Sequence, residues 1–170
     1  MTTPAAPGDL LSRLVRAEVD FVVVGGVAAV LHGAAYATRD LDIAAPINLE
    51  NVRRLWSVVA DLHPRWATVP RHPAVQESVE TLATFRNFYF LTDLGRLDVL
   101  GEIPPIPSYE ALKGSAIRMP LDGLTVAVIS INHLLQIKES LNRPQDRLVA
   151  EQLRAIRGRP SVNGAEESPG

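Results

Sequence analysis

The segment over residues 21–31 restricts the possible folds of this chain more than any other feature of its sequence. Four apolar residues, Phe21 to Val24, include three valines in a row, and such a β-branched run is typical of a buried strand. Gly25 and Gly26 follow at once, which indicates a tight turn, and an Ala-rich stretch after them is expected to form a helix. A strand that turns directly into a helix indicates a fold in which helices pack on a sheet.

Apolar periodicity along the rest of the chain alternates between the helical and the extended pattern. The order of these patterns predicts an α/β (α+β) fold with a mixed β-sheet flanked by helices and with helices at the C-terminal end. The prolines over 63–80 and 103–107 predict irregular connections. The expected strands are 21–24, 40–44, 81–91, 95–100, 117–119 and 124–128, and the expected helices are 9–15, 27–31, 48–62, 109–113, 130–141 and 145–157.

The length of 170 residues and an apolar fraction of 46% fit one globular domain. We expect this domain over 9–157, with a sheet core at 9–107 and a hairpin and helices at 108–157. The segments 1–8 and 158–170 are poor in apolar residues and are predicted to be disordered tails.

Several classes of protein are disfavoured by composition. The net charge of −2 gives no overall attraction to nucleic acid, although a local basic patch remains compatible with it. The chain has no cysteine, so carboxylates, His and Lys are left for any chemistry. Neither a signal peptide nor an apolar run of the roughly 20 residues that a membrane helix needs is visible, which predicts a cytoplasmic protein without a membrane partner.

The triplet Asp40-Leu41-Asp42 is the most informative polar feature. On a strand, Asp40 and Asp42 point to the same face, where two carboxylates repel each other unless a cation lies between them. Hard oxygen ligands of this kind suit Mg²⁺. The alternative is an ion pair of Asp40 with Arg39, or a strand that merely ends in solvent.

A third carboxylate, Asp98, stands alone in the apolar stretch 97–100. If this strand lies beside 40–44, the three carboxylates form a cluster that could hold two metal ions for displacement at phosphorus. The alternative is a charge on an edge strand that opposes aggregation. Gly25 and Gly26 could let a phosphate approach the backbone, or they could be a plain turn, since neither a dinucleotide fingerprint nor a P-loop is present.

The stretch from Phe21 to Gly33, followed by Thr38-Arg-Asp-Leu-Asp-Ile43, resembles the active-site signature of the polymerase-β-like nucleotidyltransferase superfamily. Its spacing is similar to that of the AbiEii-like group, which includes toxins of toxin–antitoxin pairs. The resemblance implies a minimal nucleotidyltransferase fold with a mixed, twisted sheet and an NTP substrate. The residue roles that it implies are Gly25, Gly26, Thr38 and Arg39 at the nucleotide, Asp40 and Asp42 on Mg²⁺, and Asp98 as the third ligand and base of a two-metal site.

Lys138 and the stretch from Arg143 to Asp146 resemble later motifs of the same group. Lys138 could grip a phosphate, or it could be a solvated lysine; Arg143 and Asp146 could belong to the site, or they could form an ion pair at a helix junction. Basic residues predominate over 138–159, where a solvated helix is favoured over an RNA-binding face. Tyr36 is expected to pack on its loop rather than to stack on a base.

These residues together predict an enzyme that transfers a nucleoside monophosphate from an NTP to an acceptor hydroxyl and releases pyrophosphate. The resemblance suggests a tRNA 3′ end as the acceptor and a cognate antitoxin protein as a partner. Two alternatives stay open: transfer to a small molecule such as an aminoglycoside or to a protein side chain, and a catalytically silent module that binds a nucleotide or a partner.

Overall fold

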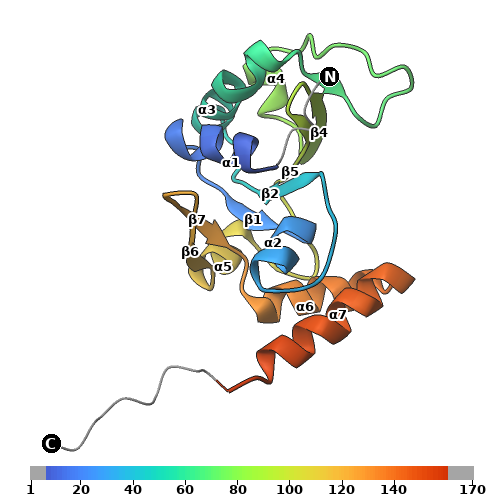
Figure 1. Ribbon diagram of the computed structural model, residues 1–170. Helices are drawn as coiled ribbons and strands as arrows, with labels where there is room; N and C mark the ends of the chain where they lie inside the picture. The colour runs from blue at the N-terminus through green and yellow to red at the C-terminus, as the bar shows by residue number, and fades with distance from the viewer. Residues whose placement is uncertain (1–6, 161–170) are drawn as a thin grey trace, which may run out of the picture.

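A seven-stranded mixed sheet organises residues 7–160, the part of the chain that the computed structural model describes (Figure 1). The strand order is β3-β4-β5-β2-β1-β7-β6, in which β2 runs parallel to β5 and antiparallel to β1. This order confirms the α/β fold with a mixed sheet. The strands are β1 (Val22–Val24), β2 (Leu41–Ala44), β3 (Arg65–Trp66), β4 (Asn87–Thr92), β5 (Gly95–Leu100), β6 (Ile117–Leu121) and β7 (Leu124–Val128).

Helices lie in the connections between the strands except at the β4–β5 and β6–β7 hairpin turns, and side-chain caps mark where several of these helices begin. Asn48 accepts a hydrogen bond from the backbone N–H of Asn51, and Ser130 accepts one from that of His133, as expected for capping residues. The helices are α1 (Pro7–Arg16), α2 (Gly25–Leu31), α3 (Leu49–Val59) with the 3-10 turn η1 (Ala60–Leu62), α4 (Val79–Leu82), α5 (Tyr109–Gly114), α6 (Ile131–Leu141) and α7 (Pro144–Arg157).

The expected strand over 81–91 is wrong in its first half. Ser78 accepts a hydrogen bond from the N–H of Thr81 and caps α4, whose Leu82 is buried in the core. The capping bond and the burial of Leu82 outweigh the β-propensity of this stretch, and the strand begins only at Asn87.

The N-terminal end of the domain differs from expectation, whereas the C-terminal helix ends at residue 157 as expected. Helix α1 begins at Pro7, so Pro7 and Gly8 do not belong to an unstructured tail. Gly158 to Pro160 follow α7 as a turn and irregular chain. The remainder of both expected tails, 1–6 and 161–170, lies outside the described residues.

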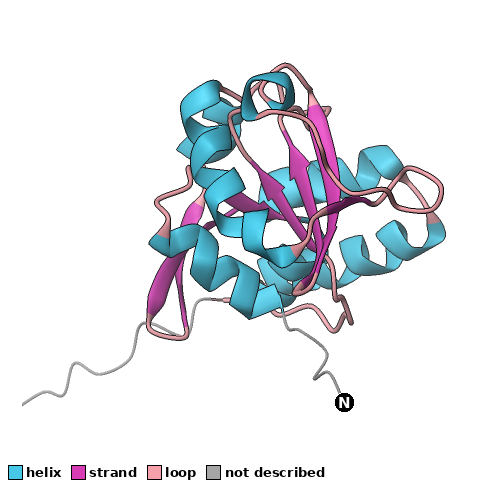
Figure 2. Ribbon diagram, turned by 90° about the horizontal axis from the view of Figure 1, so that it is seen from above, coloured by secondary structure: helices cyan, strands magenta, loops and turns pink. Residues whose placement is uncertain are grey.

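Two pairs of helices lie on opposite sides of the central strands β1 and β2 in Figure 1. Helices α1 and α3 pack together toward one end, and α6 and α7 pack together at the other (Figure 1). A second direction of view shows the β6–β7 hairpin extending from the sheet edge (Figure 2). Within residues 7–160, every helix is too short or too polar to cross a lipid bilayer.

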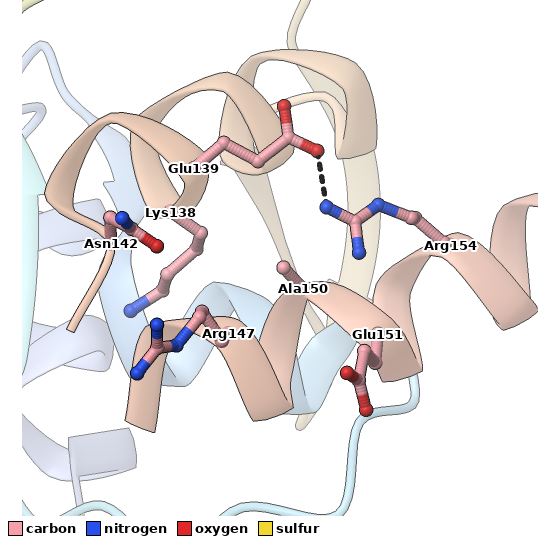
Figure 3. A pocket seen from close by; sticks show the side chains of 7 residues that line it. All are labelled: Lys138, Glu139, Asn142, Arg147, Ala150, Glu151 and Arg154. Atoms are coloured by element: carbon pink, nitrogen blue, oxygen red, sulfur yellow. Dashed lines mark hydrogen bonds and ion pairs between the residues drawn. The ribbon is translucent and has the colours of Figure 1, made fainter. Parts of the chain in front are cut away.

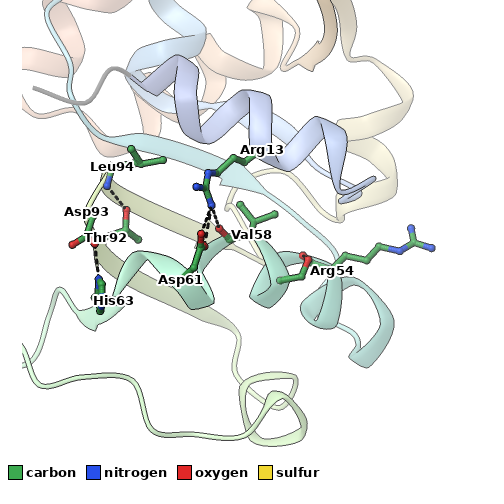
Figure 4. A network of polar contacts seen from close by, with 9 residues as sticks. Arg13, Arg54, Val58, Asp61, His63, Thr92, Asp93 and Leu94 are labelled. Atoms are coloured by element: carbon green, nitrogen blue, oxygen red, sulfur yellow. Dashed lines mark hydrogen bonds and ion pairs between the residues drawn. The ribbon is translucent and has the colours of Figure 1, made fainter. Parts of the chain in front are cut away.

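Polar contacts fix the connection after α3. Arg13 of α1 donates to the backbone oxygen of Val58 at 3.2 Å and to Asp61 at 2.9 Å, which ties α1 to the end of α3 (Figure 4). His63 Nδ1 lies 2.6 Å from the Asp93 carboxylate in the β4–β5 turn. The Arg13 contacts join two helices, and the His63 contact joins the end of η1 to the β4–β5 turn.

Buried and partly exposed residues alternate along β2 and β5, so each strand has one face in the core and one polar face. Leu41, Ile43, Leu97 and Val99 are at most 1% exposed and belong to the main core. The residues between them point to the opposite face, because successive strand residues alternate in direction. Burial of one face therefore fixes the direction in which the intervening carboxylates point.

Candidate active site

Asp42 and Asp98 lie side by side on one face of the sheet, on its two neighbouring central strands. β2 and β5 are parallel neighbours, and their register places Asp42 opposite Asp98. Both side chains are partly buried, whereas Asp40 precedes β2 and is exposed. The expected adjacency of these two strands is confirmed, and it depends on a contact between residues far apart in the sequence.

The environment of Asp42 opposes its ionisation. Burial, followed by the negative charge and hydrogen bond of Asp98 and the charge of Asp40, raises the pKa of Asp42 to about 7. The positive charge of Lys138 acts in the opposite direction. Added positive charge at this position would therefore stabilise the ionised pair.

Helix α2 begins at Gly25, directly after β1, so the expected turn at Gly25 and Gly26 is instead the first two residues of the helix, and both positions require glycine. Gly25 has a φ of +63°, and a Cβ there would overlap the carboxylate of Asp42. At Gly26 a Cβ would lie 2.6 Å from the ring of Tyr36. Gly25 thus lets Asp42 lie against the start of α2, and Gly26 lets Tyr36 pack there.

The segment between α2 and β2 is held against α7. The Tyr36 hydroxyl accepts a hydrogen bond from Gln145 Nε2 at 2.6 Å, and the N–H of Ala35 donates to Gln152 Oε1 at 2.7 Å. Tyr36 therefore packs against α2 and bonds α7, whereas packing on its own loop was expected. A cavity of about 730 Å³ borders this segment, and its lining includes Val27, Val30, Leu31, Tyr36, Thr38 and Arg39.

The Lys138, Arg143 and Asp146 side chains form one ion-pair cluster. Asp146 is 2% exposed and accepts hydrogen bonds from Lys138 Nζ at 2.9 Å and from Arg143 Nε at 2.6 Å. Burial alone would raise the pKa of Asp146, but the hydrogen bonds from Arg143 and Lys138 outweigh it and hold the pKa below its usual value. For Arg143 and Asp146, the structure shows the expected alternative of an ion pair at the junction of α6 and α7.

The groove between α6 and α7 carries further charged groups. Lys138 and Arg147 point toward the same space between these helices, and Arg154 pairs with Glu139 at 2.7 Å (Figure 3). The associated pocket has a volume of about 200 Å³. Lys138, Arg143 and Arg154 are held in ion pairs, so helices α6 and α7 present less unpaired positive charge than their number of basic residues predicts.

Sequence reasoning missed Arg96. Its Nε donates to Asp98 Oδ1 at 2.7 Å and its Nη2 to Asp98 Oδ2 at 3.1 Å, so both carboxylate oxygens are occupied. These contacts raise the pKa of the Arg96 guanidinium. The spacing contains the signal, because residues two apart on a strand share a face.

The carboxylates of the site provide two adjacent oxygen donors for a divalent metal ion. Across 7–160, no group of three or more His, Cys, Asp or Glu side chains is arranged to hold a metal, so the expected cluster of three carboxylates is not gathered. Asp40 precedes β2 and is exposed, although its charge still acts on Asp42. Asp42 and Asp98 do fit such an ion in their chemistry, since they are adjacent hard oxygen donors whose repulsion a cation relieves.

The sequence matches no protein-family model and no curated protein. Among solved structures, the lincomycin-bound lincosamide antibiotic adenylyltransferase LnuA is similar at a TM-score of 0.61, with 13% identity over 87% of this chain and 94% of that one. The antibiotic-resistance factor ANT(2'')-Ia is similar at 0.54, with 16% identity over 91% of each chain. The Megavirus polyadenylate synthase is similar at 0.56, with 10% identity over 95% of this chain and 33% of that one.

These similarities extend over nearly the whole of this chain. At identities this low they show the fold alone, and that fold is the nucleotidyltransferase fold. The chain therefore has the architecture that the sequence resemblance implied.

Proposed function

We propose that this protein is a metal-dependent nucleotidyltransferase that moves a nucleoside monophosphate from an NTP to an acceptor hydroxyl and releases pyrophosphate. The observation that carries the proposal is the register of β2 and β5, which sets Asp42 beside Asp98. In the same fold, Gly25 lies directly against Asp42. A carboxylate pair beside a strand–helix junction suits the binding of a metal–triphosphate.

The carboxylates have distinct roles in this proposal. Asp42 and Asp98 hold Mg²⁺, Asp40 adds its negative charge beside them, and Asp98 accepts the proton of the attacking hydroxyl. Bound divalent ions would neutralise charge on the triphosphate and make that hydroxyl more acidic. The mutual repulsion of Asp42 and Asp98 supports this assignment, because it leaves the pair in need of positive charge.

The remaining residues bind the NTP. Gly25 and Gly26 lie at the triphosphate, and Thr38 and Arg39 contact the nucleotide from the segment before β2. Lys138 supplies a point charge, since its charge already acts on Asp42 while its ammonium bonds Asp146. Arg143 completes the Asp146 cluster and keeps Lys138 in place.

The first acceptor that we propose is a tRNA 3′ hydroxyl, with the protein acting as the toxin of a toxin–antitoxin pair in the cytoplasm. The AbiEii-like signature supports this assignment, and a polyadenylate synthase shares the fold. Arg147 on the groove between α6 and α7 offers positive charge for an RNA backbone.

A second candidate acceptor is a small molecule carrying a hydroxyl. The cavity of about 730 Å³ beside Thr38 and Arg39 supports it. Sites for small ligands typically measure roughly 300–1,000 Å³ and are mostly apolar. Similar structures include an adenylyltransferase of lincosamide antibiotics, which is compatible with this candidate.

The experiment is a transfer assay with each of the four NTPs, labelled at the α-phosphate, and three acceptor sets: total tRNA, an aminoglycoside and lincosamide panel, and a protein extract. We expect label on one set with the wild type and none with Asp42→Asn. Asp61→Asn, which removes an exposed carboxylate on the helical layer, is the matched control and keeps activity. Absence of both transfer and divalent-ion binding in the wild type would instead support a silent binding module.

A further inference from the structure

The guanidinium of Arg96 contacts Asp98, one member of the carboxylate pair. Arg96 and Asp98 are two apart on β5 and share its polar face. The guanidinium contacts both Asp98 oxygens, at 2.7 and 3.1 Å, and the Asp98 side chain is only 13% exposed. This is the bidentate, charge-assisted geometry in which arginine binds carboxylates most strongly.

Across the sheet, β4 supports this arrangement. Tyr89 pairs in register with Asp98, and the Arg96 guanidinium lies 6.0 Å from the centre of the Tyr89 ring. Arg96 is therefore fixed from two sides, by the carboxylate and by the ring. Its side chain is still 33% exposed, so the guanidinium has access to solvent.

We infer that Arg96 is a positioning residue that acts as an exchangeable counter-ion: it holds Asp98 in the free protein and passes to the triphosphate when the nucleotide binds. The inference rests on the proposed function and assigns a regulatory step to the same site. A divalent ion that binds Asp98 competes with the two guanidinium contacts for the carboxylate charge. The free protein therefore binds the ion alone weakly, and it binds the ion tightly only together with an NTP.

The exchange follows from the chemistry of the groups. Guanidinium pairs with phosphate in the same forked geometry that it uses with carboxylate, so a triphosphate oxygen pair can replace Asp98 as its partner. The ring of Tyr89 stays beside the guanidinium during the exchange and limits how far it can move. Asp98 is then left with free oxygens beside Asp42.

The test is Mn²⁺ binding to the full chain without nucleotide, measured by electron paramagnetic resonance at neutral pH. Arg96→Ala should bind Mn²⁺ roughly tenfold more tightly than the wild type, a change that corresponds to about 1.4 kcal/mol. Arg96→Gln, which keeps much of the side chain but loses the charge, should behave in the same way. Arg86→Ala is the matched control, because it removes one positive charge from an exposed pair with Glu102 and should leave Mn²⁺ affinity unchanged.

The second arm is the affinity for a non-hydrolysable NTP analogue in saturating Mn²⁺, measured by calorimetry. Arg96→Ala should lose roughly tenfold in nucleotide affinity, and Arg96→Lys should recover part of this loss. A merely structural role does not predict opposite signs for the ion and the nucleotide. Weaker or unchanged Mn²⁺ binding by Arg96→Ala, or no detectable binding by that variant, overturns the inference.

Failure of the proposed function is seen separately. If the wild type transfers no label to any acceptor while Arg96→Ala binds Mn²⁺ more tightly and the nucleotide more weakly, the transfer reaction is refuted and the counter-ion role of Arg96 stands. If transfer occurs but the Mn²⁺ affinities of wild type and Arg96→Ala agree, the counter-ion role is refuted alone.

Discussion

Replacement of Asp146 by alanine removes the centre of the cluster that joins α6 to α7. Asp146 is 2% exposed and holds Lys138, whose side chain is 11% exposed, and Arg143, whose side chain is 66% exposed. Breaking a buried pair by removing one partner typically costs about 3–5 kcal/mol, because the other charge stays buried. Arg143 can return to water, so Lys138 determines the cost, and we expect about 3 kcal/mol, the low end of that range.

Urea unfolding at neutral pH, followed by circular dichroism, measures this cost directly. At about 2–4 °C per kcal/mol for a domain of this size, the thermal midpoint should fall by roughly 6–12 °C. Glu139→Ala is the matched control on the same helix pair, because its partner Arg154 is half exposed and such pairs contribute about 0–1 kcal/mol. The double variant Lys138→Met, Asp146→Leu should recover most of the loss. If Asp146→Ala costs no more than Glu139→Ala, the reasoning from burial is refuted.

Three further perturbations test the fold and the carboxylate pair. Gly25→Ala should lower the free energy of unfolding by at least about 1–2 kcal/mol in a thermal unfolding assay, because φ at Gly25 is positive and the new Cβ meets Asp42. Gly114→Ala is the control, because its Cβ has open space and should not destabilise the protein. Equal stability of the two variants contradicts the packing argument. Leu97→Ala, in a fully buried position, should cost about 2–5 kcal/mol in urea, and a cost below about 1 kcal/mol would argue against a close-packed core there. Folding raises the pKa of Asp42 from 3.8 to about 7, so the protonated group stabilises the fold below pH 3.8 and this stabilisation is lost as pH rises through 7. With a chelator present, Asp42→Asn should flatten the fall in the free energy of unfolding between pH 4 and 8. An unchanged pH profile would refute the raised pKa.

The sequence predicted the carboxylate pair because each member interrupts an apolar strand. Leu41 and Ile43 on one strand and Leu97 and Val99 on the other are core residues, so the polar residues between them had to point the other way. The sequence alone does not place the two strands side by side, since strand order is set by long-range packing, and their parallel pairing is known only from the structure.

Other parts of the site were out of reach of local patterns. The sequence allowed an ion pair of Arg143 with Asp146, but the burial of Asp146 and its bond to Lys138 depend on how α6 and α7 pack. The contact between Tyr36 and Gln145 joins positions 109 residues apart, so neither spacing nor periodicity can show it. The first half of the strand expected over 81–91 is wrong because the side chain of Ser78 caps a helical turn, whereas the second half is confirmed as β4.

The most direct test of the central claim is transfer of an α-labelled nucleotide by the wild type, Asp98→Asn and Asp93→Asn in one assay with magnesium. Asp98 lies opposite Asp42 on the polar face, whereas Asp93 lies in the β4–β5 turn and pairs with His63. The account predicts label on an acceptor with release of pyrophosphate for the wild type and for Asp93→Asn, and at least a hundredfold loss for Asp98→Asn, on the order of the loss seen when one transition-state contact is removed. Full activity of Asp98→Asn would contradict it.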